Sequence, residues 1–246
     1  MSKSVHHGLS RIGIVFHGQK IWISELLSIA FAIVMLVMLF SLSFSILKNE
    51  SAIHHNNQKS AGLRAEKANM ALLLVELTEQ ERIAQALTSV VGTTIAAPVY
   101  HQLVDLVYSN SKTYGYDPLL VLAVMQVESV FDPEALGRFK NKRLSGALGL
   151  MQVKPETARE IAHYLGIPLS SDADLFKPEI NLAIGVAYLT KLIKSFKSFK
   201  LGLLAYNQGP GVIKERLQEN QPLSIAYYDR VLKKYYALKK STEPRF

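Results

Sequence analysis

Three patterns of apolar and polar residues follow one another along this chain. The first is an uninterrupted apolar run, Leu26–Leu47, which has 22 residues and no charged side chain. The second, over residues 63–87, is rich in Ala, Leu, Glu and Arg and favours a helix. From residue 98 onward, helix-length segments follow one another without strand-like alternation. We therefore predict an all-α domain, preceded by one transmembrane helix and a helical linker.

The apolar run is long enough to cross a bilayer. As a helix it spans roughly 33 Å, at about 1.5 Å per residue. Its serines can bond back to helix carbonyls at little cost. A cleaved signal peptide usually has a shorter apolar region, and no small-x-small cleavage site follows the run. A buried core helix would be interrupted by polar residues sooner, so we predict an uncleaved signal anchor over residues 21–47.

The charges around this anchor predict its orientation. Residues 1–20 carry Lys3, Arg11 and Lys20 and no acidic residue. Basic residues mark the cytoplasmic side of a membrane helix. We therefore expect a cytoplasmic N-terminus at residues 1–20 and the rest of the chain on the other side. No second apolar run follows, which argues against a channel built from this chain alone.

Residues 48–97 are interpreted as a linker. The segment 51–62 is polar, and we expect it to be loose. Farther on, apolar residues recur seven positions apart, at Leu63, Met70, Leu77, Ala84 and Val91. Such spacing is compatible with a short coiled coil, or with a helical stalk lying on the domain. A Gly, Thr, Ala and Pro stretch at 90–98 breaks the pattern, so we place a boundary there and the helical domain at 98–246.

One helix of that domain carries an unusual acidic residue. Asp117-Pro118 supplies an N-cap and a proline at the first helical position. The following helix is apolar nearly all round, which is typical of a buried helix, and Glu128 lies at its end. Burial, the negative end of the helix dipole and the lack of a cation within one turn all raise the pKa of Glu128. A carboxyl kept protonated near neutral pH suits a general acid. The alternative is a glutamate that reaches water or pairs with a distant arginine.

Composition narrows the chemistry further. The chain has no cysteine, which excludes disulfides, thiolate metal sites and a cysteine nucleophile. The seven histidines show no zinc-ligand spacing, so we expect neither metal nor cofactor. The net charge of +8 indicates an anionic partner such as nucleic acid, lipid headgroups or an acidic polymer. We find no nucleic-acid recognition motif and expect no nucleic-acid partner.

Several longer motifs resemble one known family. Glu128-Ser129, Gly149–Gln152 and Ala205–Asn207 are similar, in this order, to three motifs of the soluble lytic transglycosylases. The resemblance also covers Gly185, a packing glycine of that family, and extends over roughly residues 99–240. Four segments carry it: YGYDPLLVLAVMQVESVFDP (114–133), ALGLMQVKPETA (147–158), INLAIGVAYLTKLI (180–193) and LLAYNQGPG (203–211).

This resemblance implies a lysozyme-like fold and an enzyme that cleaves the glycan strands of peptidoglycan. Glu128 would protonate the oxygen between N-acetylmuramic acid and N-acetylglucosamine. The C6 hydroxyl of the muramic residue would then attack its own anomeric carbon and leave a 1,6-anhydro end. Two alternatives stay open: a lysozyme-type hydrolase, because fold does not fix chemistry, and a glycan-binding scaffold of an envelope machine.

The resemblance also implies roles around the acid. Met151 and Gln152 would line the cleft, with Gln152 bonded to sugar groups; the alternatives are a core methionine and a capping glutamine. Tyr206 would bring its hydroxyl near Glu128, and Asn207 would contact sugar; the alternative is turn chemistry.

Two further residues complete the expected substrate-binding set. Tyr227 fits the tyrosine of the family's C-terminal segment. Ser129 would cap or orient the nearby backbone.

The chain departs from the family pattern in one loop. A basic stretch lies between the glutamate and the second motif, and Gly137 stands where the family commonly has a serine. Ser145 is a candidate to replace it. The basic residues of this loop would contact anionic stem peptides or be solvated.

Other acids have structural interpretations. Asp132 and Glu134 follow the helix end in a turn, where solvated acids are common. A hydrolase needing a second carboxylate would recruit Asp172 or Asp174.

The resemblance also implies a location. It places the catalytic domain in the periplasm of a bacterium, on a single-pass inner-membrane anchor. Peptidoglycan glycan strands are the expected partner, together with proteins of the envelope machinery.

Overall fold

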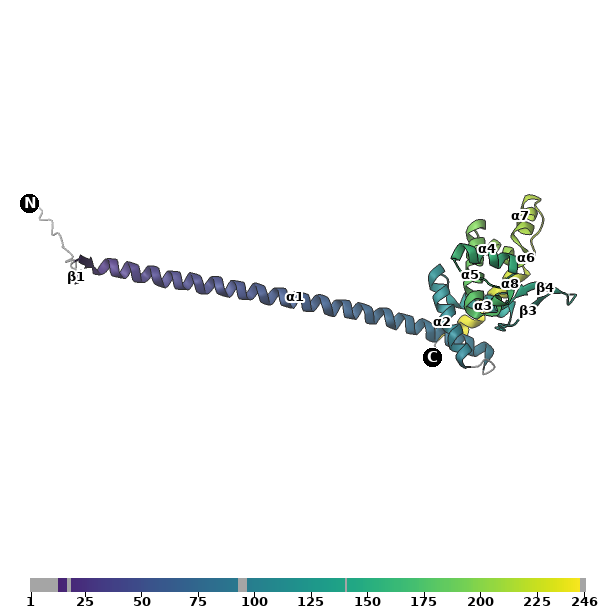
Figure 1. Ribbon diagram of the computed structural model, residues 1–246, viewed down its shortest axis with the longest axis horizontal. Helices are drawn as coiled ribbons and strands as arrows, with labels where there is room; N and C mark the ends of the chain where they lie inside the picture. The colour runs from purple at the N-terminus through teal and green to yellow at the C-terminus, as the bar shows by residue number, and fades with distance from the viewer. Residues whose placement is uncertain (1–12, 17–18, 93–96, 140, 244–246) are drawn as a thin grey trace, which may run out of the picture. The chain divides into compact units, whose positions relative to one another are not determined.

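The computed structural model describes residues 13–16, 19–92, 97–139 and 141–243 (Figure 1). The chain divides into two compact units, Met1–Leu72 and Leu73–Phe246. The longest element, helix α1 (Ile23–Val91), contributes residues to both.

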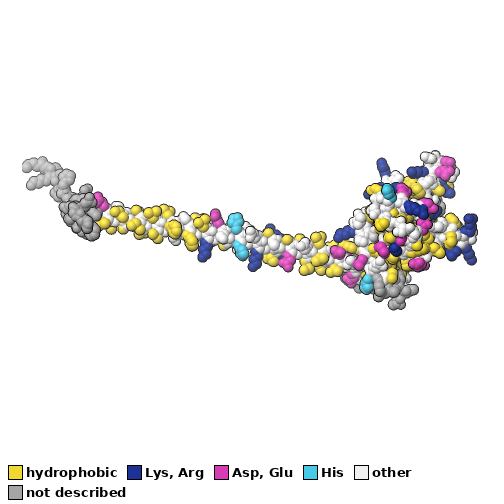
Figure 2. All heavy atoms as spheres, viewed as in Figure 1, with side chains coloured by type: hydrophobic (Ala, Val, Ile, Leu, Met, Phe, Trp, Pro, Cys, Tyr) yellow, Lys and Arg dark blue, Asp and Glu magenta, His cyan; other side chains and the backbone are white. Residues whose placement is uncertain are grey.

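In the first unit a small hairpin precedes the apolar part of α1. Strands β1 (Gly13–Phe16) and β2 (Gln19–Trp22) pair antiparallel, a feature that the apolar pattern did not predict. The apolar part of α1 has a mean hydropathy of 2.6 over its best window, and none of that window is buried. Figure 2 shows hydrophobic side chains covering this stretch. The Ser28 and Ser43 hydroxyls donate to the carbonyls of Ser24 and Leu39, as expected of serines in an apolar helix.

The polar segment 51–62 was expected to be loose, and this expectation is wrong. It continues α1 without a break. Apart from Gly62, the segment contains no residue that interrupts a helix, and Gly62 has open space around it. Polarity alone therefore did not distinguish a solvated helix from a coil.

The second unit is a helical domain with one small hairpin. Its helices after α1 are α2 (Ala97–Tyr114), α3 (Pro118–Glu128), α4 (Pro155–Leu165), the 3₁₀ helix η1 (Asp172–Phe176), α5 (Pro178–Phe196), α6 (Phe199–Gln208), α7 (Pro210–Gln218) and α8 (Ala226–Ser241). Strands β3 (Leu136–Arg138) and β4 (Leu144–Leu148) pair antiparallel between α3 and α4. The all-α prediction is confirmed.

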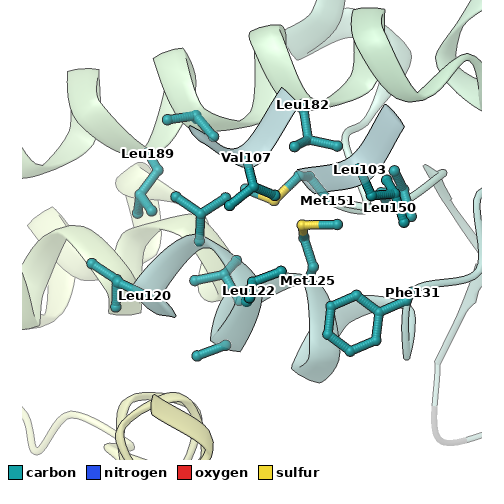
Figure 3. Packing of buried hydrophobic residues seen from close by; sticks show 14 of the residues in the cluster. Leu103, Val107, Leu120, Leu122, Met125, Phe131, Leu150, Met151, Leu182 and Leu189 are labelled. Carbon is teal, nitrogen blue, oxygen red and sulfur yellow. The ribbon is translucent and has the colours of Figure 1, made fainter. Parts of the chain in front are cut away.

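Helix α3 is the centre of the hydrophobic core. Every side chain from Leu119 to Met125 is at most 7% exposed, so α3 is buried on all sides. Helices α2 and α8 pack against it. Figure 3 shows Met125 of α3 and Met151 pointing toward each other, with Leu182 of α5 above Met151 and Leu189 of α5 to the left of the pair. A helix that is apolar all round has this position, as the sequence pattern indicated.

The core also includes the last turns of α1. Ile83, Ala86 and Leu87 are completely buried in it. The compact unit therefore begins at Leu73, ahead of the boundary expected at residue 98. These apolar residues complete the core, which agrees with the alternative of a helix lying on the domain. A coiled-coil role for the earlier part of the row stays a prediction.

The start of α3 is held by two other helices. Asp117 is its N-cap and accepts a hydrogen bond of 3.0 Å from the Leu119 N–H. Its carboxylate also accepts bonds from Arg82 of α1 at 2.7 Å and from the Tyr235 hydroxyl of α8 at 2.8 Å. Burial alone would raise the pKa of Asp117, but these bonds outweigh it and lower the pKa below the ordinary 3.8.

Replacing Asp117 by Ala is expected to destabilise the domain by about 1–2 kcal/mol, because the N-cap and its two cross-links are lost. Asp117→Asn keeps the cap and should cost less. Because the folded-state pKa lies below 3.8, the carboxylate stabilises the parent above that pH and the effect fades as the pH falls. Urea unfolding of the full chain in detergent, followed by near-ultraviolet circular dichroism at pH 7 and pH 3, measures this. Equal costs for D117A at both pH values would contradict it.

Candidate active site

Glu128 is the last residue of α3 and is half-buried. The Tyr227 hydroxyl, from α8, donates a hydrogen bond of 2.5 Å to Glu128 Oε1. Tyr227 itself is only 3% exposed. Burial raises the pKa of Glu128 to about 7, although the Tyr227 bond and the charge of Arg230 act in the opposite direction. The carboxyl is therefore about half protonated at neutral pH.

The chain leaves α3 through a tightly bonded turn. The Ser129 N–H donates to Met125 O at 2.9 Å, and its hydroxyl contacts Leu150 O at 2.8 Å and Met125 O at 3.2 Å. Val130 and Phe131 then have left-handed φ angles of 56° and 65°. Phe131 is 2% exposed and anchors the turn in the core. Ser129 thus links the end of α3 to the second motif, which agrees with the expected role in orienting backbone.

The second motif is a turn held by a buried asparagine. Asn181 of α5 is completely buried. Its Oδ1 accepts from the Met151 N–H at 2.7 Å, and its Nδ2 donates to Leu148 O at 2.9 Å and Leu175 O at 2.7 Å. Sequence reasoning missed this residue, whose signal is a lone amide within the apolar segment INLAIGVAYL. Three bonds satisfy the amide and fix the backbone beside Glu128.

Met151 contributes to the site through its backbone. Its side chain is completely buried, so it belongs to the core, which was the alternative to lining a cleft. A Cβ atom placed on Gly185 would lie 2.5 Å from Met151 Cβ, so this glycine permits the close approach. The Met151 carbonyl accepts a bond of 2.7 Å from the Tyr206 hydroxyl.

The side-chain amide of Gln152 donates its hydrogen bonds to backbone carbonyls of the protein. Its Nε2 donates to Ala135 O at 3.0 Å and Gly149 O at 2.9 Å, and its φ angle is 49°. Its Oε1 faces Gly137 and accepts no hydrogen bond from the described residues. A sugar contact by Gln152, which stays a prediction, would therefore use Oε1.

The hairpin β3–β4 brings Ser145 to the position of Gly137. A Cβ atom on Gly137 would lie 2.3 Å from Ser145 Oγ and 2.5 Å from Gln152 Oε1. The Ser145 hydroxyl therefore fills the space that a side chain at 137 would need. This geometry explains the glycine and supports Ser145 as its replacement.

The two remaining predicted residues lie at the end of α6. Tyr206 was interpreted as placing its hydroxyl near Glu128. That hydroxyl donates a hydrogen bond to Met151 O, while the hydrogen bond to the acid comes from Tyr227. Burial and the nearby Glu128 raise the pKa of Tyr206 well above 10, so the residues are close. Asn207 is exposed in the last turn of α6. Its sugar contact stays a prediction.

A hollow of about 160 Å³ lies elsewhere, between α4 and η1. Arg159 and Asp172, which line it, form an ion pair of 2.8 Å. Among the described residues, none of those that line it forms a hydrogen bond with Glu128, and we assign no substrate site to it.

Comparison with known proteins agrees with the motifs. Residues 105–228 match the transglycosylase SLT domain, and the chain belongs to this family. A membrane-bound lytic murein transglycosylase C from Edwardsiella ictaluri is 38% identical over 125 residues, which are 46% of this chain and 33% of the relative. A membrane-bound lytic murein transglycosylase E from Buchnera aphidicola is 31% identical, covering 52% and 62%.

Among solved structures, the 70-kDa soluble lytic transglycosylase from Escherichia coli is similar, with 27% identity and a TM-score of 0.48. The alignment covers 55% of this chain and 24% of that one. This chain spans about a third of the length of several of the curated relatives it matches.

Gly185→Ala is expected to destabilise the domain by about 1–3 kcal/mol, because the added methyl group overlaps Met151. The displaced Met151 backbone would also weaken the Tyr206 bond beside the acid. Gly211→Ala in α7 is the matched control, since nothing lies within 4 Å of a Cβ atom there. Thermal unfolding of the full chain in detergent should show a lower midpoint for G185A alone. A midpoint for G185A equal to that of G211A would contradict the close packing.

Proposed function

We propose that this chain is a peptidoglycan lytic transglycosylase. The observation that carries the proposal is the half-buried Glu128 carboxyl, held by Tyr227 and with a pKa of about 7. Tyr227 bonds Oε1, and within the described residues no hydrogen bond is made to Oε2, which can therefore carry the acidic proton. The family membership and the names of the relatives support a glycan substrate.

The reaction needs one carboxyl group in two roles. Protonated Glu128 gives its proton to the oxygen between N-acetylmuramic acid and N-acetylglucosamine, and the bond from this oxygen to the anomeric carbon breaks. The C6 hydroxyl of the muramic residue attacks that carbon. The Glu128 carboxylate takes the hydroxyl proton, which restores the acid and leaves a 1,6-anhydro end. Water is not consumed.

The acids considered as a second carboxylate all have partners within the described residues. Asp132 accepts a bond of 2.9 Å from the Glu134 N–H, as expected of a turn residue. Asp172 pairs with Arg159. The Lys177 ammonium, followed by the N–H groups of Ser171 and Ser170, lowers the pKa of Asp174 to about 2. In the described part of the chain, no hydrogen bond connects any of these three carboxylates to Glu128, which supports a mechanism with a single carboxyl group.

Glu128→Gln is expected to reduce glycan cleavage by at least about a hundredfold, because the general acid is lost. The parent should lose kcat/KM above about pH 7, where Glu128 ionises. Purified sacculi are digested and the released muropeptides are separated and weighed by mass spectrometry. Anhydro ends indicate transglycosylation, and reducing muramic ends indicate hydrolysis.

The control for this variant is Glu134→Gln, which changes an exposed acid just beyond the same helix. It should keep full activity. Retained turnover in E128Q, with an unchanged circular-dichroism spectrum, would refute the assignment. An E128Q midpoint at least as high as the parent's at pH 8 is also expected, since the buried carboxylate is gone.

We also propose that residues 21–47 are a single-pass anchor in the bacterial inner membrane, with the catalytic domain in the periplasm. The apolar run supports the membrane span, and the basic residues within positions 1–20 support its orientation. Peptidoglycan strands, and proteins of the envelope machinery, would meet the enzyme there.

An alkaline phosphatase fused after residue 246 is expected to be active in cells, because this enzyme matures only outside the cytoplasm. The matched control replaces Lys3, Arg11 and Lys20 by Glu. This removes the excess of basic residues before the anchor and should lower the phosphatase activity. A green fluorescent protein fusion should give the opposite pattern. Phosphatase activity near background in the parent fusion would contradict the proposed topology.

A further inference from the structure

Arg230 is an exposed residue of α8 to which the reaction above gives no role. It lies three positions after Tyr227, so both side chains are on the same side of the helix. The Arg230 guanidinium carbon is 5.8 Å from the centre of the Tyr227 ring. This distance lies within the range of cation–π attraction.

The positive charge of Arg230 is not neutralised locally. Within the described residues, no carboxylate forms an ion pair with it. Its charge instead acts on Glu128 and lowers the pKa of that carboxyl. Two tyrosines, Tyr206 of α6 and Tyr227 of α8, also face Glu128, and both stay neutral because their pKa values are raised. Of these three side chains, Arg230 is thus the one that carries a formal positive charge.

The reaction creates a need for such a charge. When Glu128 gives up its proton, a half-buried side chain becomes an anion at a site that disfavours anions. The Tyr227 hydroxyl can stabilise that anion through one hydrogen bond. A nearby guanidinium adds a Coulombic stabilisation that exists only after proton transfer.

We propose that Arg230 is a positioning residue for the acid: it orders the Tyr227 ring and stabilises the carboxylate that Glu128 becomes. The effect of Arg230 on catalysis rests on the proposed function. Its stabilisation of the Glu128 carboxylate does not depend on that function. The guanidinium is exposed, so solvent screens its charge and keeps the stabilisation moderate. A moderate effect also suits a carboxylate that must take a proton back in the second half of the reaction.

The test compares Arg230→Gln, which removes the charge, with Arg230→Lys, which keeps the charge but loses the planar group. Lys239→Gln is the control, since it removes one exposed charge from the same helix far from Glu128. The full chain in detergent is labelled with ¹³C at glutamate carboxyls, and E128Q identifies the Glu128 signal. The signal is then titrated with pH.

We expect R230Q to titrate at a higher pH than the parent, with R230K restoring most of the difference and K239Q showing none. At a pH where Glu128 is protonated, kcat of R230Q should fall about three- to tenfold, with KM little changed, and the alkaline limb of kcat/KM should move to higher pH. A merely structural role for Arg230 would lower the unfolding midpoint without moving the titration.

An R230Q titration identical to the parent's would overturn the inference, whatever the activity. Failure of the proposed function is distinguishable, because it appears as retained turnover in E128Q, while the titration measures the coupling of Arg230 to Glu128 without substrate. High salt should shrink the difference between R230Q and the parent, because screening weakens a charge effect.

Discussion

The hydrogen bond from Tyr227 to Glu128 is the contact on which the rest of the site depends. A carboxyl group at the end of an apolar helix is destabilised as an anion, and among the described residues this bond is the hydrogen bond that offsets the cost. The same helix, α8, bonds the start of α3 through Tyr235 and Asp117. Early α8 therefore meets late α3, and late α8 meets early α3. The two helices run antiparallel, bonded at both ends, and the acid cannot shift without disturbing this pair.

The backbone beside the acid is fixed by a different device. The Asn181 amide satisfies three backbone groups of the turns around Leu148, Met151 and Leu175. A buried amide with several partners specifies one arrangement, because any displacement leaves polar groups unpaired. Ser129 connects that turn to α3, and Tyr206 connects it to α6. The rigid surroundings come from polar bonds between motifs, while the hydrophobic core supplies the stability.

Much of the helical domain was predictable, because its signals are local. Asp117-Pro118 and the apolar length of the following segment predicted α3 and its burial. The raised pKa of Glu128 followed from that burial, but Arg230, which opposes it, comes from a distant part of the chain. The hydrogen-bond partner of Glu128 could not be predicted for the same reason, because nothing in the sequence near Tyr206 or Tyr227 shows which hydroxyl bonds the acid. The start of the compact unit could not be predicted either. Ile83 and Leu87 fall in the expected linker, and only the folded core shows that they are buried.

The antiparallel pairing of α3 and α8 also bears on where the domain can be cut. The family match ends at Tyr228, within the first turn of α8, and begins at Asp105, after the helix that carries Arg82. A fragment excised at those limits would keep Glu128 and Tyr227 but lose the buried Val231 and Leu238, together with Arg82 and Tyr235, the two residues that bond Asp117. Truncation of α8 beyond Tyr228 would thus remove contacts that hold α3 while leaving the matched family region in place.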